Sequence, residues 1–220
     1  MEILILAVVT LPLLTALFLK VANRFLNELL TNFITINAAL LSVAVSFFMF
    51  GYLLLDKFKP IKFELFEWYP SPQIIFEFYL DGLSGVMMIL ISGLSLVIQL
   101  FSTSYMSKDE KYTKYFEYFN FFVFSMLLLV LSGNFLVMFF GWELVGLSSY
   151  LLISFWYEKN SAAKAGNKAF ILNRIGDFGF LIGLMMILNY FETFNFVNIF
   201  ESVLIKQPSN LDLIILFLLL

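Results

Sequence analysis

A single carboxylate stands inside a long apolar stretch of this chain, in the sequence GWELVGLSSY at residues 141–150. No charge occurs from Tyr118 to Trp142, and the next one after Glu143 is Glu158. A charge at the middle of a bilayer costs about 2.5–3.5 kcal/mol on insertion scales, so such groups face protein or water and mark functional sites by default. Glu143 is therefore a candidate for proton exchange, with a cation expected from another helix. The alternative is a buried ion pair or hydrogen bond that only holds two helices together.

A second group of charges follows in AGNKAFILNRIGDFGFLIGL, residues 165–184. Arg174 and Asp177 are three positions apart, so on a helix they can pair with each other, and such a pair needs no function. Lys168 lies nearer the basic end of the segment, where its long side chain can reach the membrane surface. Together with Glu143, these residues place two acids and two bases on consecutive helices. Such a chain of exchangeable sites is what a proton relay needs in a protein without histidine.

The composition is that of a membrane protein. Hydrophobic residues make up 61% of the 220 residues, the mean hydropathy is +0.93, and only 13% of residues are charged. Soluble domains are nearer half apolar and a quarter charged, and several uncharged runs here exceed the roughly 20 residues that cross a bilayer. The sequence predicts an all-α polytopic membrane protein, in contact with membrane lipids. We treat residues 1–220 as a single transmembrane domain.

Two absences limit the chemistry. The chain has no Cys and no His, so it offers no thiolate or imidazole ligand for an iron–sulfur cluster, a haem or a typical zinc site. We therefore expect no cofactor and no metal in this chain. The net charge of −3 is spread through loops and indicates no nucleic-acid partner.

The hydropathy pattern predicts six complete transmembrane helices and the start of a seventh. The residues from 116 to 157 would form a single helix about 60 Å long, roughly twice the hydrocarbon thickness, so we expect a turn at Gly133-Asn134. The truncated seventh helix begins at Leu211. The complete helices are expected near 3–20, 31–55, 82–105, 116–133, 135–156 and 163–190.

The loop at residues 56–81 has a pattern of its own. The aromatic segments KFELFEWY and QIIFEFYL flank the sequence PSP, which predicts an external β-hairpin over 62–80. An irregular loop lying in the headgroup region is the alternative.

In the third span, a polar stripe could line a hydrated path or, as we favour, form hydrogen bonds across helices. It consists of Ser92, Ser95, Gln99 and Ser102.

The basic residues suggest an orientation. With six crossings, the loops alternate between two sides that carry eight and four basic residues. The positive-inside rule then puts the N-terminus outside and the loop at 20–30 in the cytoplasm or matrix.

Longer motifs add a resemblance. The sequence GWELVGLSSYLLISFWY, followed by SAAKAGNKAFILNRIGDFGFLIG, closely resembles the corresponding stretch of subunit 5 of proton-translocating NADH:quinone oxidoreductase, respiratory complex I. FYLDGLSGVMMILI at 78–91 and the segment 105–143 match the pattern of that subunit in the same order. The resemblance runs from about residue 60 to 190. Large subunits of multisubunit Na⁺/H⁺ antiporters share this signature.

The resemblance implies an antiporter-like helical bundle in which Glu143 matches the glutamate of a Glu/Lys pair for proton transfer. Arg174 and Asp177 match the RxGD charges that modulate this pair. It also implies a mitochondrial inner membrane or bacterial plasma membrane, and other complex I membrane-arm subunits as partners, especially an adjacent antiporter-like subunit. Flavin, iron–sulfur clusters and ubiquinone chemistry are expected in other subunits.

The chain is short for this family. Full-length members continue through about ten more helices, and the lysine partner of Glu143 lies on their helix 7. Either the subunit is split and a second polypeptide supplies the rest, as we favour, or the sequence is a fragment of a longer subunit. Two other functions compete with NADH-driven proton pumping: a subunit of a Na⁺/H⁺ antiporter, and a structural membrane-arm piece without active pumping.

Overall fold

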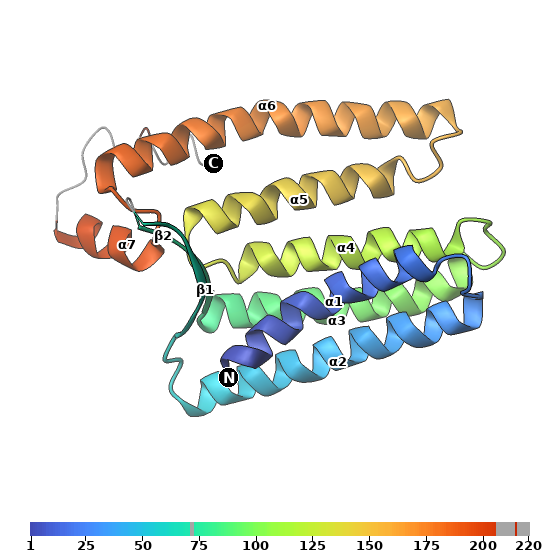
Figure 1. The fold of residues 1–220 in the computed structure, drawn as a ribbon, viewed down its shortest axis with the longest axis horizontal. Helices are drawn as coiled ribbons and strands as arrows, with labels where there is room; N and C mark the ends of the chain where they lie inside the picture. Colours follow the sequence, from blue (N-terminus) through green and yellow to red (C-terminus); the bar gives the residue numbers. More distant parts are fainter. Residues whose placement is uncertain (71–72, 206–213, 215–220) are drawn as a thin grey trace.

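The computed structural model describes residues 1–70, 73–205 and 214. Long helices lie side by side, and a β-hairpin and a short helix occupy one end of the molecule (Figure 1). The elements in chain order are α1 (Glu2–Ala22), α2 (Glu28–Leu55), β1 (Ile61–Pro70), β2 (Gln73–Leu80), α3 (Gly82–Tyr105), α4 (Tyr112–Val130), α5 (Phe135–Ile153), α6 (Asn160–Phe191) and α7 (Phe196–Ile205). The predicted fold class is confirmed, and the predicted seventh helix from Leu211 lies outside the described residues apart from position 214.

Five of the described helices are long and apolar enough to cross a membrane: α1, α2, α3, α5 and α6. The exception among the six predicted spans is α4, which begins four residues earlier than expected, with the polar sequence YTKYFEYFN. It nevertheless lies alongside α1 and α5 over its length (Figure 1). Large apolar side chains on the outer helix faces are well exposed, for example Phe33 at 68% and Phe178 at 68%, as expected for surfaces that face lipid. The chain is a multi-pass membrane protein.

Polar side chains mark where several helices begin. Asn27 accepts a hydrogen bond from the Leu30 amide at 2.9 Å at the start of α2. Asp81 and Ser84 form a capping box at the start of α3, with bonds of 2.8 and 2.7 Å. These caps satisfy amides that have no partner within the helix and so fix where each helix leaves its loop.

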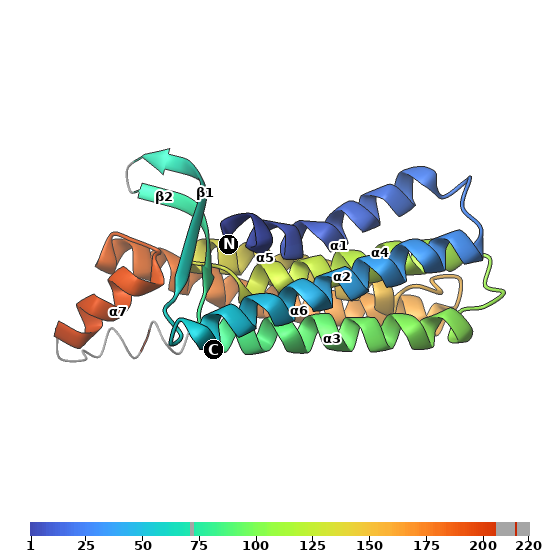
Figure 2. The same ribbon diagram turned by 90° about the horizontal axis from the view of Figure 1, so that it is seen from below.

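The predicted β-hairpin is confirmed. β1 and β2 are antiparallel, from Ile61 opposite Leu80 to Pro70 opposite Gln73, and the hairpin projects from one end of the helix layers (Figure 2). Its base is anchored to the turn between α4 and α5, because the Tyr79 amide donates to the Leu131 carbonyl at 2.8 Å and the Gly133 amide donates to the Glu77 carbonyl at 3.0 Å. Gly133-Asn134 is therefore a turn, as predicted.

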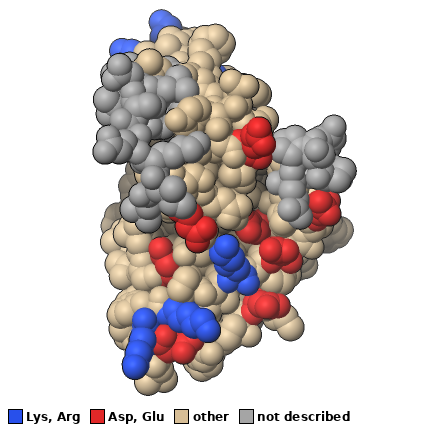
Figure 3. Space-filling model, turned by 90° about the vertical axis from the view of Figure 1, so that its left-hand side faces the viewer, with Lys and Arg blue, Asp and Glu red and all other residues tan. Residues whose placement is uncertain are grey.

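The two ends of the molecule differ in charge. The loops with Arg24, Lys108, Lys111 and Lys159 lie at the end opposite the hairpin (Figure 1). The hairpin end carries acidic side chains with lysines among them (Figure 3). The described acids there are Glu2, Asp56, Glu64, Glu67, Glu77, Asp81, Glu192 and Glu201.

The polar stripe of α3 is buried and only partly bonded across helices. Ser102 lies 3.0 Å from the Tyr115 hydroxyl of α4, which is a bond of the kind we favoured. Ser92 and Ser95 instead donate to carbonyls of their own helix. The Gln99 Oε1 atom is buried and has no hydrogen-bond partner among the described residues.

Candidate functional site

The candidate site lies between α5 and α6. α5 begins at Phe135, where the Asn134 side chain accepts a hydrogen bond from the Val137 amide at 2.8 Å. The two helices come together at Gly146, where an added Cβ would lie 3.7 Å from the side-chain nitrogen Nδ2 of Asn173 in α6. This approach brings residues 143 and 174 of the two helices into reach of each other.

Arg174 lies between two carboxylates. Its Nη1 forms an ion pair and hydrogen bond with Glu143 Oε2 of α5, and it lies 3.6 Å from Asp177 Oδ2 of α6. We call Glu143, Arg174 and Asp177 the charge cluster. Arg174 thus supplies the cation from another helix that we expected for Glu143, and it also keeps its predicted neighbour three positions along.

The members of the charge cluster differ in exposure. The Asp177 side chain is 8% exposed, that of Glu143 20% and that of Arg174 45%. A carboxylate removed from water needs a paired charge or hydrogen bonds to stay ionised. Asp177 receives such a bond from the indole Nε1 of Trp142, which donates to Asp177 Oδ1 at 2.9 Å.

Lys168 does not join the charge cluster. It lies on α6 six residues before Arg174, about 9 Å along the helix axis. Its side chain is exposed and forms no hydrogen bond or ion pair with the described residues. A role for Lys168 in a proton relay remains a prediction.

An apolar groove lies beside Trp142, the residue that bonds to Asp177. A cavity of about 690 Å³ is lined by side chains of α3, α4, α5, α6 and α7, by Ser132 of the α4–α5 turn, and by Tyr79 and Asp81. Trp142 and Phe180 form part of its wall, and Phe196 and Phe200 of α7 another part. The helix α7 was not predicted, because its ten residues are too few to span a bilayer.

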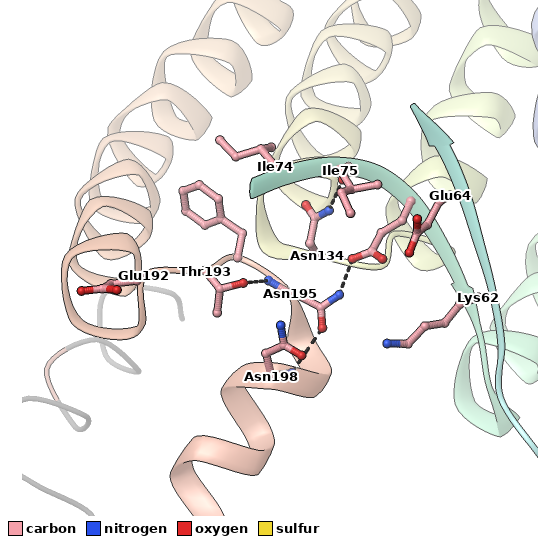
Figure 4. Close-up of a pocket in the computed structure, with 11 residues that line it drawn as sticks. Lys62, Glu64, Ile74, Ile75, Asn134, Glu192, Thr193, Asn195 and Asn198 are labelled. Carbon is pink, nitrogen blue, oxygen red and sulfur yellow. Dashed lines mark hydrogen bonds between the residues drawn. The ribbon is translucent and has the colours of Figure 1, made fainter. Parts of the chain in front are cut away.

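A second ionisable site, which the sequence did not single out, lies at the hairpin end (Figure 4). Glu77 of β2 is only 4% exposed, and its Oε1 accepts a hydrogen bond from Asn195 Nδ2 at 2.5 Å. Asn134 Nδ2 donates to the Ile75 carbonyl at 2.7 Å beside it. These residues line a polar cavity of about 460 Å³ together with Lys62, Glu64, Ile74, Glu192, Thr193, Phe194 and Asn198. Alternation in β2 gave no signal for Glu77, because burial there depends on the distant α6–α7 turn.

The surroundings of Glu77 change its protonation. Burial raises the pKa of the Glu77 carboxyl above its usual value of 4.5, while the Asn195 hydrogen bond and the positive charge of Lys62 oppose this rise. The carboxyl therefore holds its proton more tightly than a solvated glutamate does.

No metal centre is formed by the part of the chain that the structure describes: no group of three or more His, Cys, Asp or Glu side chains could hold a metal ion there. The chemistry available at the charge cluster is ion pairing and proton transfer.

The fold and the charge cluster define a class: multi-pass membrane proteins whose spanning helices carry paired, ionisable side chains. Two family descriptions match the chain. "NADH-Ubiquinone oxidoreductase (complex I), chain 5 N-terminus" matches residues 68–116, and "NADH:quinone oxidoreductase/Mrp antiporter, TM" matches residues 132–220, which include the charge cluster. The chain belongs to the chain 5/subunit L family of antiporter-like membrane subunits of NADH:quinone oxidoreductase.

Curated relatives agree with this assignment. NADH-quinone oxidoreductase subunit L of Rickettsia bellii is 36% identical over 195 residues, which cover 88% of this chain and 30% of the relative. NADH-ubiquinone oxidoreductase chain 5 of Metridium senile is 35% identical over 213 residues, which cover 96% of this chain and 35% of the relative. The chain thus spans about a third of the length of these relatives.

Solved structures share the fold. A chain of the archaeal membrane-bound sulfane sulfur reductase, a respiratory membrane complex, matches with a TM-score of 0.84 at 21% identity, covering 100% of this chain and 43% of that one. A chain of respiratory complex I from Thermus thermophilus with bound aureothin matches with a TM-score of 0.70 at 17% identity, covering 96% and 42%.

Proposed function

We propose that the chain is part of a proton-translocating membrane-arm subunit of a respiratory NADH:ubiquinone oxidoreductase. The observation that carries the proposal is the position of Arg174 between Glu143 and Asp177, inside two membrane-spanning helices. A cation shared by two carboxylates can move toward one or the other, and each move changes how readily Glu143 binds a proton. Charge movement elsewhere in the membrane arm would drive that exchange.

In this proposal the chain carries no redox chemistry. NADH oxidation and quinone reduction take place in partner subunits, and this chain contributes the intramembrane charges. Neighbouring membrane-arm subunits are its partners, in the mitochondrial inner membrane or a bacterial plasma membrane. The N-terminus and the hairpin then lie on the intermembrane-space or periplasmic side, supported by the basic loops at the opposite end of the molecule.

A second polypeptide that carries the remaining antiporter-like helices is one partner in our proposal, as the resemblance suggested. Mass spectrometry of the purified complex tests it: a separate chain with the remaining antiporter-like helices supports the proposal, and one continuous subunit contradicts it.

The test of proton translocation uses the intact complex in sealed vesicles. Glu143→Gln keeps the size and hydrogen-bonding ability of the side chain and removes its charge. We expect fewer protons moved per NADH oxidised while the complex still assembles. The control is Glu158→Gln, which changes an exposed acid paired with Lys111 at the basic end. Equal proton stoichiometry in wild type and Glu143→Gln would reject the function.

A sodium/proton antiporter subunit is the second candidate, because the description that matches residues 132–220 also covers Mrp antiporters. Na⁺-dependent proton exchange in vesicles without NADH would favour it. Copurification with flavin and iron–sulfur chains would favour the oxidoreductase. A purely structural role predicts that neutralising Glu143 and Asp177 together changes neither pumping nor NADH oxidation.

A further inference from the structure

Trp142 connects the charge cluster to the apolar groove. Its indole nitrogen donates to Asp177 Oδ1 at 2.9 Å, while its ring lies in the wall of the groove and is 49% exposed. It is also the residue directly before Glu143. A single rigid side chain therefore touches one acid of the charge cluster and is joined through the backbone to the other.

We propose that Trp142 is a positioning residue for proton transfer: its indole N–H holds Asp177 so that Arg174 stays on Glu143. This inference rests on the proposed function.

The geometry shows how the positioning works. Asp177 has two carboxylate oxygens, and the indole occupies Oδ1. The other oxygen, Oδ2, faces Arg174 at 3.6 Å, beyond hydrogen-bond reach, whereas Arg174 bonds directly to Glu143. A hydrogen bond to a carboxylate stabilises its charge, so the indole shares with Arg174 the task of satisfying a buried acid. Without the indole, Asp177 would draw the guanidinium away from Glu143.

Aromatic packing holds the indole in place. The Trp142 ring is nearly parallel to that of Phe180, with centroids 6.1 Å apart, and Phe180 stacks on Phe139 at 5.4 Å. All three side chains belong to α5 and α6, so the stack fixes the indole relative to both halves of the charge cluster. Stacked pairs of this kind have a preferred geometry, which makes the direction of the N–H donor well defined.

The test compares Trp142→Phe with Trp156→Phe in the complex, in vesicles. Trp142→Phe keeps the stack and removes the donor. Trp156 is the matched control, because its Nε1 also donates to an aspartate, Asp109 Oδ2 at 3.0 Å, but in the loops at the basic end. A hydrogen bond to a charged group corresponds to about a tenfold change in a protonation equilibrium. We expect the pH profile of proton pumping to shift by about one pH unit in Trp142→Phe and to stay unchanged in Trp156→Phe.

A double-mutant cycle separates positioning from packing. If the indole acts through Asp177, Trp142→Phe causes no further shift in an Asp177→Asn background, since the charge that it stabilises is gone. Additive shifts, or a wild-type profile in Trp142→Phe, would overturn the proposal. If Trp142→Phe fails to assemble, Trp142→His restores a ring N–H donor. If Trp142→His assembles and has the wild-type pH profile of proton pumping, the positioning role of the indole is supported. An unchanged pH profile in Asp177→Asn contradicts that role.

These variants also separate a failure of the proposed function from a failure of the role of Trp142. Glu143→Gln without effect on pumping rejects the proposed function itself. Loss of pumping in Glu143→Gln together with a wild-type pH profile in Trp142→Phe rejects only the role of Trp142.

Discussion

Arg174 of α6 forms an ion pair with Glu143 of α5, a residue 31 positions earlier in the chain. The pair joins two membrane-spanning helices, and Asp177 lies close enough to compete for the same guanidinium. Removing one partner of a poorly solvated pair leaves an uncompensated charge, which is more costly than having no pair at all.

Neutralising Arg174 should leave both carboxylates without their cation. In Arg174→Gln, the loss of a charge-assisted hydrogen bond, worth about 1.5–3 kcal/mol, changes the protonation equilibrium constant of Glu143 by about tenfold or more. We expect a strong loss of proton pumping, measured as vesicle acidification per NADH oxidised. Arg174→Lys should retain part of the activity, because it keeps the charge but not the planar fork of the guanidinium. Wild-type pumping in Arg174→Gln would contradict the role of the pair.

Lys168 should matter much less than Arg174. It is exposed and has no ionic partner among the described residues. Lys168→Gln is expected to reduce pumping less than Arg174→Gln does, when both are compared at the same level of assembled complex. A loss as large as that of Arg174→Gln would show that Lys168 belongs to the relay, as its sequence position first suggested.

Close packing of α4 against α5 should depend on Gly141. An added Cβ there would lie 2.7 Å from the backbone nitrogen and Cα of Leu129, which cannot move without shifting the helix. Overpacking of this kind costs about 1–3 kcal/mol, so Gly141→Ala should lower the thermal stability and yield of the complex. Gly176→Ala is the control, since nothing lies within 4 Å of its added Cβ. Equal yields of the two variants would contradict this packing.

Much of the fold could be predicted because it depends on local patterns. Hydrophobic runs gave the long helices, and the aromatic segments around PSP gave the hairpin. The short helix α7 and the burial of Glu77 could not be predicted, because both depend on contacts between the hairpin and the α6–α7 turn, which are far apart in sequence. The hydrogen bond from Asn195 Nδ2 to Glu77 Oε1 is one such contact.

The site was predicted in part for the same reason. The energetic cost of placing a charge in an apolar segment is enough to single out Glu143, Arg174 and Asp177 as candidate site residues. Their geometry is a property of two helices packed together: three-residue spacing predicted the Arg174–Asp177 neighbour, but only the packing of α5 on α6 shows that Arg174 bonds to Glu143. Trp142 was not predicted, because a tryptophan within a span gives no indication of which acid its indole will contact.

The hairpin should be held less firmly as the pH rises. Below pH 4.5, the usual pKa of a glutamate, Glu77 is protonated whether or not its site is formed, so it costs nothing. As the pH rises through its raised pKa, the closed site must give up a proton that it holds tightly, and the anchoring weakens until Glu77 is fully ionised. Above that pH, Glu77→Gln should slow hydrogen exchange of the Tyr79 and Gly133 amides relative to wild type at the same pH.

The control for this effect is Glu67→Gln, which changes an exposed acid of β1 that lies opposite Ile75 rather than Glu77. It should leave the exchange of both amides unchanged. Faster exchange in Glu77→Gln than in wild type at pH 8 would show that the ionised carboxylate holds the hairpin, contrary to our expectation.

The central claim is that Glu143 takes up and releases a proton while Arg174 pairs with it. Difference infrared spectroscopy of the vesicle-bound complex, before and after energisation with NADH, tests it most directly, because a carboxylic acid has a C=O band that a carboxylate lacks. The account predicts a carboxyl band that changes on energisation and disappears in Glu143→Gln, while Glu158→Gln keeps it. An identical difference spectrum in wild type and Glu143→Gln would contradict the account.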